Sequence, residues 1–225
     1  MSRLASGWTA ATYGAVVLGL YMAFRYAPPE RVMGNVQRIF YFHVAAAWVG
    51  FLAFGIVFVA SLAYLRRGRA RWDRLAAAAA ELGVLFTTIT LVMGSLWARA
   101  VWGVWWTWDP KLTTTLILWF LYAGYLLIRA AVDDRSQRGR YSAVLGIAGF
   151  LNVPIVYMSS VWWTSIHPVL RDQPGMNLDP AMRLALQVAV GAFTLLFLLL
   201  LNQRVRLARL ADRVRELGET GPERG

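Results

Sequence analysis

Six long apolar stretches divide this chain, and they constrain its fold more than any other feature of the sequence. They cover residues 8–24, 39–65, 82–101, 112–128, 141–161 and 181–201. Each is about long enough for a helix to cross a hydrocarbon layer roughly 30 Å thick. Apolar residues make up 58% of the chain and charged residues only 16%, which is far from the mixture of a water-soluble domain. We therefore expect an all-α integral membrane protein with six transmembrane helices.

The stretches leave little chain for anything else. We expect residues 1–225 to form a single six-helix membrane domain whose residues 201–225 are a basic cytoplasmic tail. In that tail Leu207, Leu210, Val214 and Leu217 recur at helical spacing among arginines. This pattern favours a continuation of the sixth helix that rests on anionic headgroups, and docking onto a cytoplasmic partner is the alternative. Residues 8–24 are expected to remain as an anchor rather than a cleaved signal peptide.

The net charge of +11 is distributed unevenly along the chain. Sixteen of the 23 basic residues lie in alternate connections and at the two ends, which is the positive-inside pattern. We therefore expect both termini to be cytoplasmic, the first, third and fifth loops to face outward, and no nucleic acid to be bound. The sixteen residues are Arg3, Arg66, Arg67, Arg69, Arg71, Arg74, Arg129, Arg135, Arg138, Arg140, Arg204, Arg206, Arg209, Arg213, Arg215 and Arg224.

Several kinds of chemistry are excluded by residue usage. The chain has no cysteine, so disulfides, thiolate metal sites, iron–sulfur clusters and thioether attachment of haem through this chain are ruled out. Ionisable residues are nearly absent inside the apolar stretches, and this argues against a secondary transporter. Pro154 falls inside the fifth stretch, where it predicts a kink.

The only two histidines, His43 and His167, are expected on the same outer side of the membrane. His43 lies on the second predicted helix, about one turn from its outer end. His167 precedes Pro168, which disfavours a helical backbone and predicts a loop. Imidazole is a common axial ligand of haem, so one helical and one loop histidine could bind the iron from its two faces.

Tryptophan gathers beside these histidines. Five tryptophans occur within residues 97–108. With Trp162 and Trp163, seven of the eleven tryptophans lie at or beyond the predicted outer ends of the helices. An aromatic belt at the membrane interface is the plain interpretation. Because the excess lies on one side, we favour a flat apolar shelf for a planar macrocycle, with Gly103 allowing close approach. The five are Trp97, Trp102, Trp105, Trp106 and Trp108.

Charged residues flank this shelf. Asp109 precedes Pro110 and an apolar stretch, which predicts an N-cap followed by proline in the first helical turn, and it leaves open a second role in orienting the shelf. Lys111 and Arg99 are the nearest outward cations. They could neutralise haem propionates or extend to lipid headgroups.

These segments together resemble a known family. Residues 102–109 with Pro110, Lys111, Leu112 and Thr113 resemble the tryptophan-rich WWD signature of haem-handling proteins, and the six-span length fits the cytochrome c maturation protein C (CcmC) family. Residues 39–44 with Ala47 and Trp48 agree, as do residues 152–158 leading to Trp162, Trp163 and His167. The resemblance covers nearly the whole chain from the second to the fifth apolar stretch.

The resemblance implies a function. It implies a haem-binding, non-enzymatic subunit in the bacterial inner membrane that holds haem b non-covalently at the periplasmic face. Its partners would be an ATP-binding cassette transporter pair, a small single-span subunit and a periplasmic haem chaperone, which receives the haem. Carried over residue by residue, the axial iron ligands would be His43 and His167, and the shelf would be Trp102, Trp105, Trp106 and Trp108 with Asp109.

Two other functions remain possible from the sequence. A bis-histidine electron-transfer cytochrome b could use the same two ligands, although such proteins usually bury haem between helices. A larger subunit of the cytochrome c–haem ligation machinery carries the same signature, but those chains tend to have more spans and more histidines.

Overall fold

Seven α-helices dominate residues 3–167 and 178–220, the part of the chain that the computed structural model describes. A π-helix, η1 (Met22–Tyr26), extends α1, and a short 3-10 helix, η2 (Asn35–Gln37), precedes α2. These residues include no strand, and six helical segments are long and apolar enough to cross a membrane. The all-α, six-span prediction is thereby confirmed. The α-helices are α1 (Arg3–Tyr21), α2 (Arg38–Arg67), α3 (Ala70–Trp102), α4 (Pro110–Ala131), α5 (Arg135–Phe150), α6 (Asn152–Trp162) and α7 (Pro180–Thr220).

The helices are longer than the apolar stretches that predicted them. Helix α3 begins at Ala70 rather than near residue 82, so Arg74, expected in a loop, lies within a helix. Gly68 ends α2 with a left-handed backbone (φ 61°) and donates its N–H to the Tyr64 carbonyl, a common helix C-cap. Hydropathy detects only the part of a helix that suits hydrocarbon, and charged residues are acceptable where the helix continues into the headgroup region.

The fifth predicted span is broken. Helix α5 ends at Phe150, Leu151 forms a turn, and α6 begins at Asn152. Pro154 accounts for the break, because proline has no N–H to donate to the carbonyl four residues earlier and its ring crowds that carbonyl. The predicted kink is confirmed.

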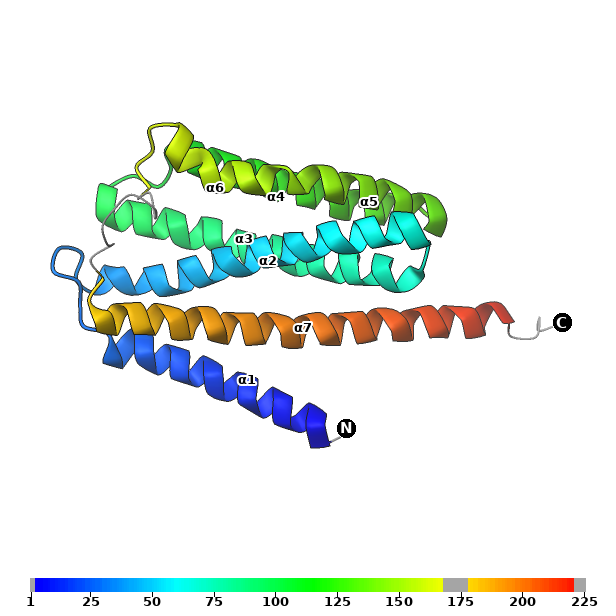
Figure 1. The fold of residues 1–225 in the computed structure, drawn as a ribbon, viewed down its shortest axis with the longest axis horizontal. Coiled ribbons are helices and arrows are strands. Elements are labelled where there is room, and N and C mark those ends of the chain that lie inside the picture. The colour runs from blue at the N-terminus through cyan, green and yellow to red at the C-terminus, as the bar shows by residue number, and fades with distance from the viewer. Residues whose placement is uncertain (1–2, 168–177, 221–225) are drawn as a thin grey trace.

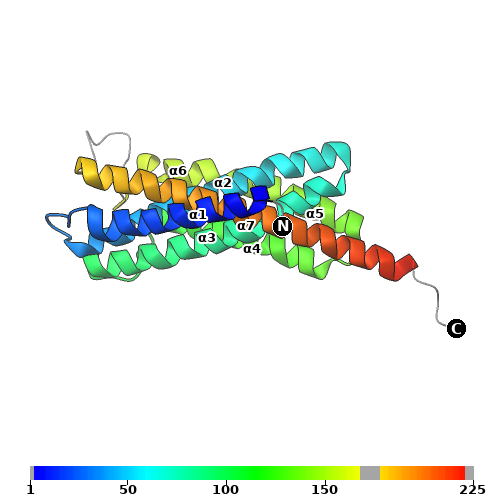
Figure 2. The ribbon, with the colours of Figure 1, turned by 90° about the horizontal axis from the view of Figure 1, so that it is seen from below.

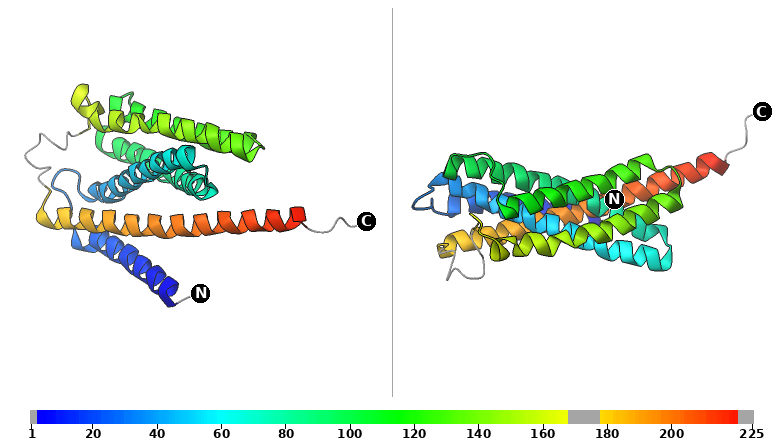
Figure 3. Two further views of the ribbon diagram at one scale, coloured as in Figure 1. Left: turned by 45° about the vertical axis from the view of Figure 1, so that its right-hand side comes forward. Right: turned by 90° about the horizontal axis from the view of Figure 1, so that it is seen from above.

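The α2–α3 hairpin occupies the middle of the bundle (Figure 1). Helices α4, α5 and α6 lie on one side of it, and α7 with α1 lies on the other; the turned views in Figures 2 and 3 show α1 running beside α7. Helices α2 and α3 pack against each other more extensively than any other pair. The alanines at 76 and 78–80 of α3 are buried, and small side chains let helix backbones approach closely.

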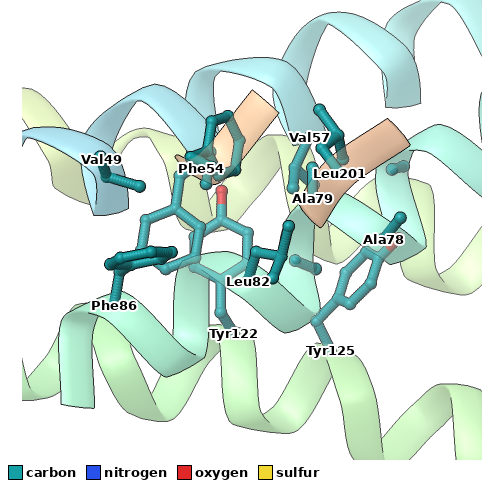
Figure 4. Close-up of a cluster of buried hydrophobic side chains, with 14 of the residues drawn as sticks. Val49, Phe54, Val57, Ala78, Ala79, Leu82, Phe86, Tyr122, Tyr125 and Leu201 are labelled. Carbon is teal, nitrogen blue, oxygen red and sulfur yellow. The ribbon is translucent and has the colours of Figure 1, made fainter. Parts of the chain in front are cut away.

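Aromatic stacking fixes the centre of the core. Phe54 of α2 stacks on Tyr122 of α4 with ring centroids 3.7 Å apart and an interplanar angle of 12° (Figure 4). A Cβ at Gly83 of α3 would overlap the Phe54 ring, so glycine is required there. The Tyr122 hydroxyl donates to the Gly146 carbonyl of α5 at 3.1 Å. This layer joins four helices across the bundle.

Helix α7 is one unbroken helix of 41 residues, about 60 Å long at 1.5 Å per residue. The predicted continuation of the sixth helix is confirmed as far as Thr220, and residues 221–225 of the expected tail lie outside the described residues. Figure 1 shows α7 running straight past the bundle, and the expectation that its basic second half rests on anionic headgroups stays a prediction. The described chain starts and ends toward the same end of the bundle, as an even number of crossings requires.

Candidate functional site

His43 lies in the second turn of α2, with its ring against α3. Its Nδ1 atom is 3.0 Å from the backbone carbonyl of Thr90. A carbonyl oxygen can only accept, so Nδ1 carries the proton and Nε2 is left free to bind a metal in the neutral ring. A Cβ at Gly94 would lie 2.9 Å from the Cε1 atom of the ring. The absence of a side chain at Gly94 therefore makes room for the imidazole.

His167 lies in the loop that follows the end of α6 at Trp162, and its predicted loop position is confirmed; Pro168 lies outside the described residues. The Asp109 carboxylate holds this loop: it accepts the Ile166 N–H at 2.8 Å and the Ser165 hydroxyl at 3.0 Å. The same carboxylate accepts the Lys111 N–H at 2.9 Å and caps α4, with Pro110 in the first turn. The N-cap prediction is confirmed, and the contacts to the loop were not foreseen.

Asp109 and His167 have protonation states that would suit metal binding by the imidazole. Burial raises the pKa of the Asp109 carboxyl, but hydrogen bonds from Ile166, Ser165 and Lys111 outweigh it and lower the pKa below its ordinary value. Burial lowers the pKa of the His167 imidazole, although Asp109 acts in the opposite direction. At neutral pH the 3.3 Å contact from Nδ1 to Asp109 is thus a hydrogen bond from a neutral ring rather than an ion pair. Its Nε2 atom, like that of His43, is left to bind a metal.

The two histidines, 124 positions apart in the numbering of the chain, line the same cavity. This cavity of about 90 Å³ is bounded by α2, α3, α4 and α6 and by the His167 loop. Lys111 and Thr115 of α4 and Val156 of α6 are among its lining residues. The fold therefore brings together two residues that the sequence places far apart.

Two tryptophans join the histidine rings. Trp97 lies with its ring centroid 6.3 Å from that of His43 and 6.0 Å from that of Trp102. Trp102 in turn lies 6.4 Å from His167. Both tryptophans belong to the last turns of α3, not to a loop, because α3 continues to Trp102 and ends at Gly103 with a φ of 75°. The arrangement is a continuous aromatic wall from one imidazole to the other.

Comparison with known protein families matches residues 1–219 to the family described as heme exporter protein C. The chain belongs to this family. Heme exporter protein C of Bradyrhizobium diazoefficiens is 38% identical over 219 residues, which are 96% of this chain and 82% of that protein. The Escherichia coli K12 protein of the same name is 36% identical over 200 residues, 88% of this chain and 81% of that one. That of Rhodobacter capsulatus is 30% identical over 221 residues, 96% and 90% of the two chains.

In this heme exporter protein C family member, the remaining predicted shelf tryptophans form an outer rim. Trp106 and Trp108 meet edge to face at 5.9 Å, and Trp105 lies 5.9 Å from the Arg99 guanidinium. Trp105 and Trp108 are 57% and 75% exposed. Among the described residues, these three rings have no ring contact with either histidine. The predicted shelf is thus divided into Trp102, whose ring contacts that of His167, and three tryptophans whose rings, within the described residues, contact neither histidine.

The two candidate cations also occupy different places. Lys111 lines the cavity between the histidines, and its ammonium donates to the Ser160 hydroxyl at 3.2 Å. Arg99 instead donates to the Gly103 carbonyl and lies over the Trp105 ring. Of the two, only Lys111 is a cavity-lining residue.

Sequence reasoning did not select Thr90 or Gly94 for the site, and it counted Trp97 only as one of the clustered tryptophans, without a contact to His43. They recur at positions i, i+4 and i+7, so all three lie on the face of α3 that meets His43. That spacing marks one face of a helix. The signal was therefore in the sequence, but it becomes informative only when α3 is known to pack against α2.

Proposed function

We propose that this protein is the haem-binding membrane subunit of a cytochrome c maturation complex, with His43 and His167 as axial ligands of the haem iron. One observation carries the proposal. Two histidines from distant segments line one cavity, and each has its Nδ1 atom against an oxygen acceptor. A hydrogen bond at one ring nitrogen fixes the tautomer and the orientation of the ring, and it leaves the other nitrogen for the metal.

The small volume of the cavity favours a haem that is held only in part and can be released. A cavity of about 90 Å³ is well below the 300–1,000 Å³ that encloses a ligand of moderate size, so a haem held there extends beyond it. The exposed rim of Trp105 and Trp108 offers flat apolar surface for the part outside. Because the chain has no cysteine, this haem b is held without a thioether bond, and no catalytic residue is assigned.

Polar groups in and near the cavity suit the carboxylates of haem. The Trp97 indole N–H is buried and, among the described residues, has no hydrogen-bond partner. A buried donor without an acceptor is costly and calls for a ligand or water. Lys111 adds a positive charge on the same cavity. We propose that these two groups meet the propionates, with Trp102 against the ring.

The orientation and partners follow from the family and from the charges. We propose that the histidine end faces the periplasm of a bacterial inner membrane and that both termini are cytoplasmic, because the basic residues concentrate at the opposite end. There the site would be open to a periplasmic haem chaperone. An ATP-binding cassette pair and a small single-span subunit complete the proposed complex, consistent with the heme exporter names of the relatives.

Visible absorption and magnetic circular dichroism of the purified protein test the ligand assignment. Wild type should show low-spin bis-imidazole bands, and His43→Ala and His167→Ala should each lose them. Trp72→Phe, at the far end of α3, is the control and should keep them. Unchanged bands in both histidine variants would reject the proposed ligands.

Delivery needs a second measurement, the loading of a periplasmic haem chaperone in cells. Both histidine variants should stop loading, while Trp72→Phe should not. Rapid reversible reduction of the haem by quinol without any acceptor chaperone would instead indicate the electron-transfer function.

A further inference from the structure

A second and much larger cavity lies at the end of the bundle opposite the histidines. It has a volume of about 910 Å³ and is lined by the end of α2, the start of α3, the end of α4, the start of α5 and the second half of α7. In Figure 1 these segments lie at the end of the bundle where α2 turns into α3 and α4 turns into α5, and α7 runs past that end. Neither the family assignment nor the haem proposal gives this cavity a role.

The lining is strongly basic. Among the described residues, seven arginines and three carboxylates line the cavity, a formal excess of four positive charges. The three carboxylates are already engaged by four of the arginines. Arg129 pairs with Asp73 at 2.5 and 2.9 Å, Arg204 with Glu81, and Arg74 and Arg135 share Asp212 at 3.0 and 3.4 Å.

Three arginines of the lining, Arg138, Arg140 and Arg215, have no ion pair within the described part of the chain. The Nε atoms of Arg138 and Arg74 are buried and, among the same residues, have no hydrogen-bond partner. A buried guanidinium donor left without an acceptor costs free energy. The cavity therefore has both charge and donor capacity that the protein itself does not satisfy.

We propose that this cavity binds a phosphate group, that of an anionic lipid headgroup or of a free phosphate. Guanidinium groups bind phosphate with paired, charge-assisted hydrogen bonds. The lipid source is favoured because apolar residues such as Leu65, Leu126 and Ala208 share the lining, so one ligand that is both anionic and apolar would satisfy both parts. Basic pockets between transmembrane helices on the cytoplasmic side commonly bind such headgroups.

The test compares two triple variants of the full-length protein. Arg138→Gln, Arg140→Gln and Arg215→Gln together remove the unpaired cavity arginines. Arg206→Gln, Arg209→Gln and Arg213→Gln remove the same charge from α7 residues that do not line the cavity. Binding of cardiolipin, phosphatidylglycerol and zwitterionic phosphatidylcholine is measured by native mass spectrometry and by the thermal stability of the detergent-solubilised protein.

We expect the anionic lipids to bind wild type and the α7 control, and the cavity variant to bind them at least about tenfold more weakly. Inorganic phosphate alone, tested on the same three proteins, distinguishes the two sources. If phosphate stabilises wild type and the control but not the cavity variant, and wild type retains no anionic lipid, the ligand is a free phosphate. Equal binding by the cavity and control variants with every probe would overturn the proposal. A cooperative thermal transition in every variant verifies folding, and because it needs no bound haem it keeps this result separate from that of the histidine site.

Discussion

The carboxylate of Asp109 accepts hydrogen bonds from two directions, one within the first turn of α4 and the other from the loop that carries His167. The first contact is local, and the motif of aspartate followed by proline predicts it. The second joins residues more than fifty positions apart, and no local pattern encodes it. A residue with a complete structural explanation as an N-cap can therefore also position the loop histidine.

The double role of Asp109 is separable by substitution. Asparagine is as good an N-cap as aspartate, so Asp109→Asn should leave α4 intact, while the neutral amide should hold the Nδ1–H of His167 less strongly. We expect haem affinity to fall about 10- to 100-fold with little change in thermal stability, as measured by haem titration and melting.

Asp109→Ala is the comparison, because alanine cannot cap the helix. Its unfolding free energy should fall by about 1 kcal/mol, and its melting temperature should fall with it. If Asp109→Asn binds haem as tightly as wild type and with the same absorption bands, Asp109 does not position His167.

For single residues, the sequence shows which side chains are unusual for this chain better than it shows which side chains contact one another in the fold. His43 and His167 stand out because they are the only histidines, and the tryptophans because they cluster. Gly94 has no such signal: it matters because the His43 ring occupies the space of its missing side chain, which depends on how α2 and α3 pack. The two parts of the tryptophan shelf likewise separate only once α3 is seen to continue to Trp102.

At the scale of helices, the break between α5 and α6 changes what the fifth span can contact. Before the break in the chain, α5 packs on α2 and α4. After it, α6 packs mainly on α4. The side-chain amide of Asn152, the first residue of α6, donates to the Thr114 carbonyl of α4 at 2.8 Å. Through this contact α6, which carries Val156 into the histidine cavity, is fastened to the helix that Asp109 caps.

Replacing Asn152 with alanine should therefore loosen α6. Interhelical hydrogen bonds in membranes contribute about 1 kcal/mol, so we expect the melting temperature to drop by about 2–4 °C. Haem affinity should fall as well, because the wall formed by α6 is less fixed. Leu151→Ala, at an exposed neighbouring position, is the matched control; equal melting of the two variants would show that the hydrogen bond contributes nothing measurable.

The helices themselves were the most predictable level of this structure. An apolar stretch long enough to cross a membrane must be helical, because backbone groups in hydrocarbon need internal partners. Helix ends were less predictable, as the early start of α3 and the length of α7 show, since beyond the hydrocarbon both helix and loop satisfy the backbone. Pro154 is the exception, because its covalent structure dictates the break.

For the molecule as a whole, the two cavities at opposite ends give the bundle a polarity. Lys111 is the one cation in the described lining of the cavity that holds both histidines, whereas arginines dominate the other. The sequence predicted this asymmetry from the distribution of basic residues, but it could not predict the cavities, which arise from the spacing between helices.

The proposed orientation can be tested directly, because the chain has no cysteine and any introduced thiol is unique. Val32→Cys and Val104→Cys lie in exposed connections at the histidine end, and Arg69→Cys lies between α2 and α3 at the other. In intact spheroplasts a membrane-impermeant maleimide should label the first two and not the third. After permeabilisation all three should react, and the reverse pattern in intact cells would invert the proposed topology.

Helix α7 has a mechanical consequence. At about 60 Å it is twice as long as the hydrocarbon layer is thick, and it contains no hinge that would absorb bending. Its first turns pack Met182 and Ala185 beside α2, and the ion pairs of Arg204 and Asp212 join its second half to α3 and α5. Its last turns extend past the bundle (Figure 1). A partner bound to the protruding turns would therefore be connected, through one continuous helix, to the end of the molecule where His43 lies.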